Sequence, residues 1–304
     1  MAKVLITGGA GFIGSNLTDM LVEKGYEVLV LDNLSSGKKE NINPKAKFYN
    51  ADIRDERSIS PIFKGVDFVF HLAAIPRVPI SVQDPIGTSE VNIMGSLNVF
   101  NSARKAGVKR VVFASSSSVY GNQKKMPLKE NMEASPVSPY GLQKFVGEKF
   151  AGIFSNLYNL SIVSLRYFNV YGPRIDYESN ESLVIGKFLR QKQEGKPFTI
   201  CGDGKQTRGF CFVDDVNEAN ILAMESKKIK GGEVVNIGSK KSYSVNEIAD
   251  LIDGEKQYLP KRKGDVLHTK ADIGLAKKLL GWIPKISFEE GIEMTKKWFN
   301  NVRY

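Results

Sequence analysis

The stretch TGGAGFIG, residues 7–14, directly follows the apolar run KVLIT at residues 3–7 and decides the fold class. It places Gly8, Gly11 and Gly14 at G-x-x-G-x-x-G spacing, where a strand is expected to end and a helix to begin. Glycines at these positions permit a tight turn and let a pyrophosphate approach the backbone N–H groups at the positive end of the helix. The stretch therefore predicts the phosphate-binding turn of a dinucleotide site.

Asp32 ends the second apolar run, 18 residues after Gly14. A carboxylate there can accept hydrogen bonds from both hydroxyls of an adenosine ribose and repels a 2′-phosphate. The residue therefore favours NAD over NADP as cofactor. Lys38 and Lys39 lie close to Asp32 in sequence, so NADP stays open as an alternative cofactor. The alternative without any cofactor is an ordinary strand-turn-helix in which the aspartate is incidental.

Further apolar runs, bounded by turn residues, occupy residues 27–32, 67–73, 110–115 and 161–168, and helical patterns lie between them. Strands that are apolar throughout and alternate with helices indicate a parallel sheet buried on both faces. The expected fold class is α/β, with a doubly wound parallel sheet of the Rossmann type and a smaller C-terminal substrate lobe.

Composition excludes several classes of protein. Hydrophobic residues make up 42% of the 304 residues, but the apolar stretches are strand-sized and shorter than the about 20 residues that span a bilayer. The start of the chain carries no secretion signal, so we expect a cytoplasmic protein without a membrane partner. Cys201 and Cys211 have no histidine near them in sequence, so no metal site is expected.

The formal net charge of +10 raises the question of nucleic acid as a partner. The basic residues do not interleave with aromatic ones, as a platform for stacking bases requires. We therefore expect no nucleic-acid partner, and instead a solvated lysine surface with a site for an anionic ligand.

Two features suggest acid/base chemistry. Ser115–Ser118 follow an apolar run, at the sheet edge where ligands of α/β proteins bind. Tyr140 and Lys144 stand at i and i+4, on one face of a helix expected to begin near Pro139. Forming phenolate at pH 7 costs a free tyrosine about 4 kcal/mol, and a nearby ammonium and nicotinamide cation reduce that cost. A surface Tyr–Lys pair is the alternative, which the glycine turn and the serines disfavour.

Together these motifs resemble the extended short-chain dehydrogenase/reductase family, and within it the NAD-dependent UDP-sugar 4-epimerases of the UDP-glucose and UDP-N-acetylglucosamine type. The resemblance covers nearly the whole chain. Its further motifs are DNLSSG (32–37), HLAA (71–74), ASSSSVYG (114–121), SPYGLQK (138–144), LRYFNVYGPR (165–174), GDGKQTRGF (202–210) and RKGDVLHTKADI (262–273).

The resemblance implies a set of NAD contacts in addition to the glycines and Asp32. These are Phe12, Ile13, Asn33, Leu34, Ser35, Ser36, Gly37, Asp52, Ile53, Leu72, Ala73, Ala74, Ile75, Asn92, Ser115, Tyr140, Lys144, Tyr167 and Phe168.

The resemblance also assigns catalytic roles to Tyr140, Lys144 and Ser116. Tyr140 takes the proton of the sugar 4-hydroxyl while carbon 4 gives hydride to NAD, and the transient 4-keto sugar receives it back on its other face. Sugar dehydratases carry carboxylates beside the serine position, because removing water needs an extra acid and base. Ser117 and Ser118 stand there in this chain, which favours epimerisation.

For the UDP-sugar substrate, the resemblance implies that Arg208 and Arg262 hold the diphosphate and Asp265 the ribose. Gly209 departs from the family, which usually has aspartate there. In the resembling epimerases, a tyrosine at the position of Thr269 shuts out N-acetyl groups. Because threonine lacks the aromatic ring, the expected substrate pairs are UDP-GlcNAc/UDP-GalNAc and UDP-Glc/UDP-Gal. The remaining expected substrate contacts are Ser116, Ser117, Tyr140, Asn169, Leu183, Val184 and Ile200.

Alternative functions stay open. They are a UDP-glucuronic acid 4-epimerase, another nucleotide-sugar dehydratase or reductase of the family, and a catalytically silent NAD-sensing or RNA-associated relative. We expect residues 1–168 to form the NAD-binding Rossmann domain and residues 169–304 the nucleotide-sugar lobe, with part of 211–237 returning to the first domain. By resemblance, helices at residues 86–106 and 139–158 are expected to form a homodimer.

Overall fold

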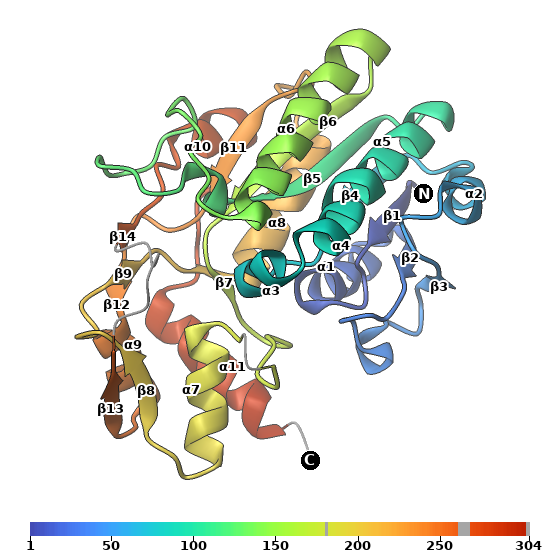
Figure 1. Ribbon diagram of the computed structural model, residues 1–304. Helices are drawn as coiled ribbons and strands as arrows, with labels where there is room; N and C mark the ends of the chain where they lie inside the picture. Colours follow the sequence, from blue (N-terminus) through green and yellow to red (C-terminus); the bar gives the residue numbers. More distant parts are fainter. Residues whose placement is uncertain (180–181, 261–267, 302–304) are drawn as a thin grey trace.

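A seven-stranded parallel sheet forms the centre of the molecule (Figure 1). The computed structural model describes residues 1–179, 182–260 and 268–301. In spatial order the strands of the sheet are β11 (Val234–Ile237), β6 (Ser161–Tyr167), β5 (Arg110–Ser116), β4 (Phe68–His71), β1 (Lys3–Thr7), β2 (Glu27–Asp32) and β3 (Lys47–Asn50). The predicted α/β fold class with a doubly wound parallel sheet is confirmed.

The order of the strands reverses beside β1, and this reversal places the site. The chain runs from β1 outward to β2 and β3, then crosses to β4 on the other side of β1. In folds with such a reversal, the connections after the neighbouring strands lead to opposite faces of the sheet, and ligands bind in a crevice at this place on the carboxyl edge. The glycine turn of residues 8–14 follows β1, and the HLAA loop of residues 71–74 follows β4.

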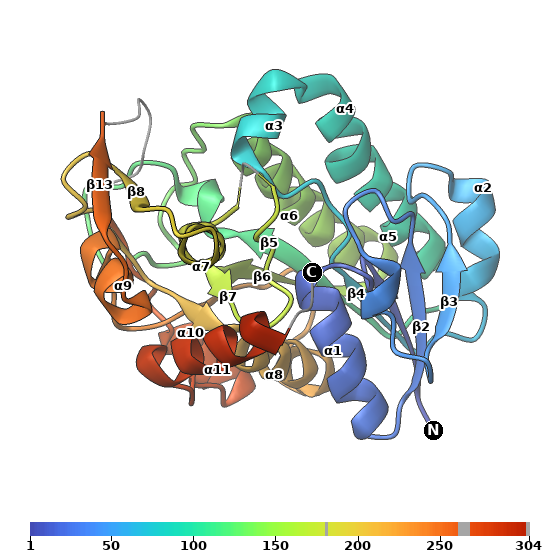
Figure 2. The same ribbon diagram turned by 90° about the horizontal axis from the view of Figure 1, so that it is seen from below.

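Helices cover both faces of the sheet, as Figure 2 shows. Alternate residues of β1 point to opposite faces. Val4 and Ile6 belong to a core cluster that includes residues of α1 and α8, whereas Leu5 belongs to a second cluster with residues of α5 and α6. The helices around the sheet are α1 (Phe12–Glu23), α2 (Glu56–Ile59), α3 (Val78–Gln83), α4 (Pro85–Ser89), α5 (Ser96–Lys105), α6 (Pro139–Tyr158) and α8 (Val213–Glu225), with short helical turns η1 (Lys39–Asn41), η2 (Ser60–Phe63), η3 (Glu90–Gly95) and η4 (Ser117–Tyr120).

Short elements form most of the C-terminal part, at the lower left of Figure 1. The glycines and prolines after Phe168 prevent long strands, and three small sheets result, with strand orders β10-β7, β12-β9-β14 and β13-β8. Their strands are β7 (Val170–Tyr171), β8 (Phe198–Cys201), β9 (Thr207–Arg208), β10 (Cys211–Phe212), β12 (Tyr243–Ser244), β13 (Lys256–Leu259) and β14 (His268–Thr269). The helices of this part are α7 (Val184–Gln193), α9 (Val245–Ile252), α10 (Gly274–Leu280) and α11 (Phe288–Asn301).

Among the described residues, no helix combines the length and apolarity that crossing a bilayer requires. The same part of the chain contains no group of three His, Cys, Asp or Glu side chains able to hold a metal ion.

Candidate active site

The glycine turn packs so closely that side chains would not fit in it. Gly8 has φ +75°, in the left-handed region, and a Cβ there would lie 2.7 Å from the backbone nitrogen of Ala73 in the HLAA loop. A Cβ on Gly14 would collide with the carbonyl oxygen of Gly8. Helix α1 then begins at Phe12 with no side-chain cap and no acidic residue in its first turn. The uncapped positive end of the helix fits the diphosphate of a dinucleotide.

The carboxylate of Asp32 is fixed from two sides by backbone donors. Oδ2 accepts from the backbone nitrogen of Ala10 at 3.0 Å, and Oδ1 accepts from that of Leu34 at 2.8 Å. Leu34 has φ +58°, and a Cβ on Gly37 would meet Ala10 at 2.8 Å, so the loop is folded tightly over the glycine turn. Each carboxylate oxygen has a further lone pair, which suits the two ribose hydroxyls of NAD.

Asn33 connects this loop to the segment after β3. Its Nδ2 donates to Oδ2 of Asp52 at 2.9 Å. Asp52 also pairs with Arg54 at 2.8 Å, and the hydrogen bond from Arg54 lowers the pKa of Asp52 to about 2. Ile53 is buried, and a Cβ on Gly95 would collide with its side chain. Ser35 and Ser36, which belong to the same loop as Asn33, are both exposed.

Asn92 ties the loop after β4 to α6. Its Oδ1 accepts from the backbone nitrogen of Ile75 at 2.8 Å, and its Nδ2 donates to the carbonyl of Ile75 at 3.1 Å and to Oε1 of Gln143 at 2.7 Å. The amide therefore holds the loop that carries Leu72, Ala73 and Ala74. Just before that loop, His71 is hydrogen bonded at both ring nitrogens, and burial lowers its pKa to about 3. His71 is therefore a neutral structural residue.

Tyr140 lies at the beginning of α6, which starts at Pro139 as predicted. Its backbone nitrogen donates to Oγ of Ser81 at 3.1 Å. The side chain is only 8% exposed, and burial raises the pKa of the hydroxyl. A hydrogen bond with Ser116 and the charge of Arg77 act in the opposite direction on this pKa. The predicted pair Tyr140 and Ser116 is thus brought together at the end of β5.

Lys144 lies one turn further along α6 and is buried. Its Nζ donates to the carbonyl oxygen of Ala114 at 2.7 Å and lies 6.0 Å from the centre of the Tyr140 ring. Burial lowers the pKa of Lys144 to about 8, and the charge of Glu148 opposes this shift. The ammonium is therefore fixed in the orientation that the i, i+4 spacing predicts.

Sequence reasoning missed the buried ion pair beneath this site. Glu148 and Arg166 form two hydrogen bonds of 2.8 and 2.7 Å, with side chains only 3% and 4% exposed. The hydroxyl of Ser115 donates to Glu148 rather than turning toward the crevice. The available signal was that Glu148 follows Tyr140 and Lys144 at further four-residue steps on one face of α6.

Several other predicted contacts have side chains turned into the protein. The hydroxyl of Tyr167 donates to Oδ1 of Asn220 on α8 at 2.7 Å, and Phe168 is fully buried. Ile200 is 1% exposed and belongs to the main core cluster. Phe12 and Ile13 also pack partly against this core.

The predicted substrate residues Asn169, Arg208 and Thr269 meet at the small sheet β12-β9-β14. Thr269 on β14 is paired in register with Arg208 on β9, and Nδ2 of Asn169 lies 3.4 Å from Oγ1 of Thr269. Nδ2 of Asn169 also donates to the carbonyl oxygen of Gly209 at 2.9 Å. A Cβ on Gly209 would face carbonyl oxygens of Ser239 and Thr269 at 3.4 Å, a poor environment for the aspartate that the family usually has.

The other predicted substrate residues lie apart from this group. Leu183 precedes α7 and is 39% exposed, and Val184 begins that helix. Ser117 begins the turn η4 directly after Ser116. Arg262 and Asp265 lie outside the described residues.

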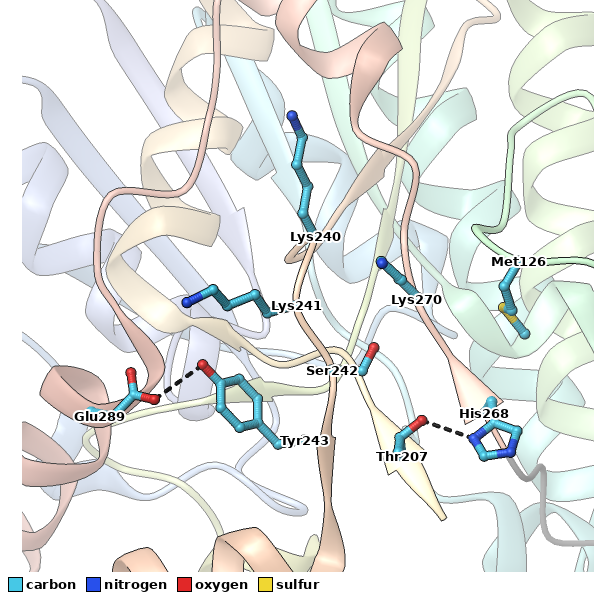
Figure 3. A pocket seen from close by; sticks show the side chains of 9 residues that line it. All are labelled: Met126, Thr207, Lys240, Lys241, Ser242, Tyr243, His268, Lys270 and Glu289. Atoms are coloured by element: carbon cyan, nitrogen blue, oxygen red, sulfur yellow. Dashed lines mark hydrogen bonds between the residues drawn. The ribbon is translucent and has the colours of Figure 1, made fainter. Parts of the chain in front are cut away.

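A cavity of about 510 Å³ borders the small sheet β12-β9-β14 (Figure 3). Thr207 and His268 line it, and they precede Arg208 and Thr269 in strands whose successive side chains alternate between faces. Its further lining residues are Met126, Lys240, Lys241, Ser242, Tyr243, Lys270 and Glu289. None of the predicted site residues within the described part of the chain lines this cavity, so we place the active site at the sheet edge around Tyr140.

Comparisons with known proteins agree with this architecture. The model of the family described as "NAD dependent epimerase/dehydratase family" matches residues 4–238. A putative UDP-glucose 4-epimerase of Methanocaldococcus jannaschii is 44% identical, with 98% of each chain covered. The crystal structure of UDP-glucose 4-epimerase with UDP-glucose from Thermotoga maritima has a TM-score of 0.94 and 43% identity, again over 98% of each chain.

A further similar solved structure is that of an enzyme that acts on an N-acetylated sugar nucleotide. The UDP-N-acetylglucosamine 4-epimerase from Methanobrevibacter ruminantium M1, in complex with UDP-N-acetylmuramic acid, has a TM-score of 0.93 and 39% identity, with 98% of each chain covered. The predicted family resemblance and the predicted cofactor are thereby confirmed at the level of the family, whose description itself specifies NAD. The chain belongs to the NAD dependent epimerase/dehydratase family, among its UDP-sugar 4-epimerases.

Proposed function

We propose that this protein interconverts UDP-sugars that differ in configuration at carbon 4, with Tyr140 as the base. The observation that carries the proposal is that Tyr140, at the beginning of α6, lies beside Ser116 at the carboxyl end of β5 and one turn from Lys144, whose ammonium is fixed on the carbonyl oxygen of Ala114. This arrangement can take a proton from a carbinol and return it. Among the residues that the structure describes, no carboxylate hydrogen bonds to Tyr140 or Ser116 as an extra acid for dehydration would.

Each residue has a distinct task in the proposed reaction. The glycine turn and Asp32 would hold NAD, which when bound supplies reversible hydride transfer at carbon 4. Tyr140 removes the proton of the sugar 4-hydroxyl, and Ser116 donates a hydrogen bond to the same oxygen as the transient 4-keto sugar forms. The buried ammonium of Lys144 favours the phenolate of Tyr140. Tyr140 then returns the proton when the sugar is reduced on its other face.

The test is incubation of the protein with a panel of UDP-sugars without added NAD, followed by separation of the products by configuration at carbon 4. Tyr140→Phe removes only the titrating hydroxyl, so it should keep fold and bound NAD while turnover falls about 10²- to 10⁴-fold. Turnover within a few fold of the wild-type protein would contradict the role of Tyr140. Release of free NADH would instead indicate a one-way dehydrogenase.

For the substrate, we infer that UDP-GlcNAc and UDP-GalNAc are accepted, together with the UDP-glucose pair. Thr269 supports this inference because it lacks an aromatic ring and lies within reach of Asn169 and beside Arg208. Thr269→Tyr should remove activity on N-acetylated sugars and spare UDP-galactose, whereas Thr269→Ser, as matched control, should keep both. An equal loss of activity on both substrates would show that other residues determine the specificity. A preference of the wild-type protein for UDP-glucuronate would favour the alternative of a UDP-glucuronic acid 4-epimerase.

We also propose that two copies associate through α4, η3 and α6. These elements contact one another and expose large apolar side chains, among them Ile86 at 75%, Met94 at 54% and Leu142 at 51%. Exposed apolar side chains gathered on one surface mark an interface. Ile86→Glu should convert the dimer to a monomer in sedimentation equilibrium, and a wild-type monomer at micromolar concentration would contradict the proposal.

A further inference from the structure

A short segment after β7 contacts several elements around the crevice. It comprises residues 173–179, and we call it the strap. The carbonyl oxygen of Pro173 accepts a hydrogen bond from Nδ2 of Asn16 on α1 at 3.0 Å. Arg174 pairs with Asp19 of the same helix at 2.7 Å. The first residues of the strap are therefore fixed to the helix that follows the glycine turn.

Two further ion pairs attach the strap to loops on opposite sides of β1. The ammonium of Lys38, in the loop after β2, lies 2.7 Å from Oε1 of Glu178. The guanidinium of Arg77, in the loop after β4, lies 2.7 Å from Oδ2 of Asp176. Since β2 and β4 are the two neighbours of β1 in the sheet, one stretch of three residues joins the loops that flank the glycine turn.

Both loops are themselves packed against the glycine turn. The backbone nitrogen of Lys38 donates to the carbonyl oxygen of Ala10 at 3.1 Å. On the other side, a Cβ on Gly8 would lie 2.7 Å from the backbone nitrogen of Ala73. Residues 176 and 178 can be at most about 7 Å apart along the chain. The strap therefore passes from one loop to the other at the carboxyl end of β1, where the diphosphate of NAD is proposed to lie.

The strap is also bound to the C-terminal part of the chain. The Tyr177 side chain is only 6% exposed, and its ring packs edge to face on that of Phe299 of α11, with ring centres 5.0 Å apart. The carbonyl oxygen of Glu178 accepts from Nη1 of Arg190 on α7 at 2.7 Å. The strap thus has contacts on both parts of the molecule.

We propose that the strap retains the cofactor, so that the ion pairs of Asp176 and Glu178 must open before NAD can enter or leave the crevice. The inference rests on the proposed function, because epimerisation requires that the hydride removed from carbon 4 stays on the protein until it returns to the sugar. If NADH escaped first, the sugar would remain in its 4-keto form and the protein would lack its cofactor. The two pairs are partly exposed and contribute little to the free energy of unfolding.

The experiment measures how fast NADH leaves the wild-type protein, Asp176→Asn, Glu178→Gln and the double variant. Protein loaded with NADH is mixed with an excess of NAD, and the fluorescence of bound NADH is followed. Asp176→Asn should speed release about 5-fold, the more exposed Glu178→Gln about 2-fold, and the double variant about 10-fold. The matched control is Glu56→Gln, which breaks an exposed ion pair with Lys105 on other helices and should leave release unchanged.

The sign of the effect separates the strap from simple attraction between charges. Both substitutions remove a negative charge and free the cation that it paired. A freed cation beside the anionic diphosphate would slow release, whereas an opened strap speeds it. Asp176→Asn also keeps an oxygen that can accept from the backbone nitrogens of Glu178 and Ser179, as Asp176 does at 3.1 Å. The turn at this end of the strap should therefore persist.

Slower or unchanged release in the variants would overturn the proposal, and the single variants give the same test of sign if the double variant does not fold. In long assays without added NAD, the double variant should lose 4-epimerase activity with time, and added NAD should restore it. A loss that NAD does not restore would contradict the proposal. A wild-type protein that binds no NADH would overturn the proposed function as well, whereas unchanged release from an active epimerase would overturn the strap alone.

Discussion

The cofactor side and the substrate side of Tyr140 are built in different ways. On the cofactor side, backbone donors fix the functional side chain, as the backbone nitrogens of Ala10 and Leu34 do for Asp32. On the substrate side, Asn169 and Thr269 are 100 residues apart in the chain; Asn169 directly precedes β7 and Thr269 lies on β14, and each of these strands has only two residues. The proposed reacting groups therefore rest on the large sheet and its helices. The short elements that carry the proposed substrate contacts can vary in sequence without disturbing the fold.

Beneath the cofactor side lies the interaction with the largest expected effect. Glu148→Gln leaves the Arg166 guanidinium buried without its full counter-charge, so the free energy of unfolding should fall by about 3–5 kcal/mol. Urea unfolding measures this. The matched control is Glu56→Gln, which breaks the exposed pair with Lys105 and should leave the free energy of unfolding nearly unchanged. An equal fall in the free energy of unfolding in both variants would show that burial does not make the Glu148–Arg166 pair more important for stability than an exposed pair.

The next largest effect concerns the ribose carboxylate. Asp32→Ala should weaken NAD binding by about 10- to 100-fold, because hydrogen bonds to a charged acceptor are lost, and should leave UDP binding unchanged. Calorimetric titration of both ligands checks this separation of the two sides. Unchanged retention of NAD after purification would show that the ribose carboxylate is misassigned.

A smaller effect is expected at the junction of the two sides. Ser116→Ala removes one hydrogen bond to Tyr140 but leaves the base in place, so kcat should fall only about 10-fold. Steady-state kinetics should therefore show a milder loss than Tyr140→Phe causes. A loss as large as that of Tyr140→Phe would make Ser116 an equal partner in the proton transfer.

The smallest effect is expected on the substrate side. Asn169→Ala removes the bond to the Gly209 carbonyl, and the KM for the UDP-sugar should rise about 3- to 5-fold, equivalent to roughly 1 kcal/mol. NAD binding, measured in parallel, should stay unchanged. Weaker NAD binding would mean that the two sides are not separable at this residue.

The fold class, the family and the glycine turn after β1 could be predicted from the sequence alone, because the patterns that indicate them lie within short stretches of the chain. Three features can be recognised without knowing which distant residues they contact: the glycine spacing, the carboxylate at the end of β2 and the i, i+4 pair on α6. Tertiary structure alone decided where side chains on buried strands turn: Ser115 toward Glu148, and Tyr167 toward Asn220.

Tertiary structure also decided which charges meet. Arg166 pairs with Glu148 because β6 packs against α6, and Arg77 in the loop after β4 pairs with Asp176, 99 residues further along the chain. The physical reason is that the energy of a charge depends on the groups within a few ångströms and on its burial, and local sequence patterns specify neither. The acidity of Tyr140 is therefore a property of the folded molecule, although its place in the motif is legible in the sequence.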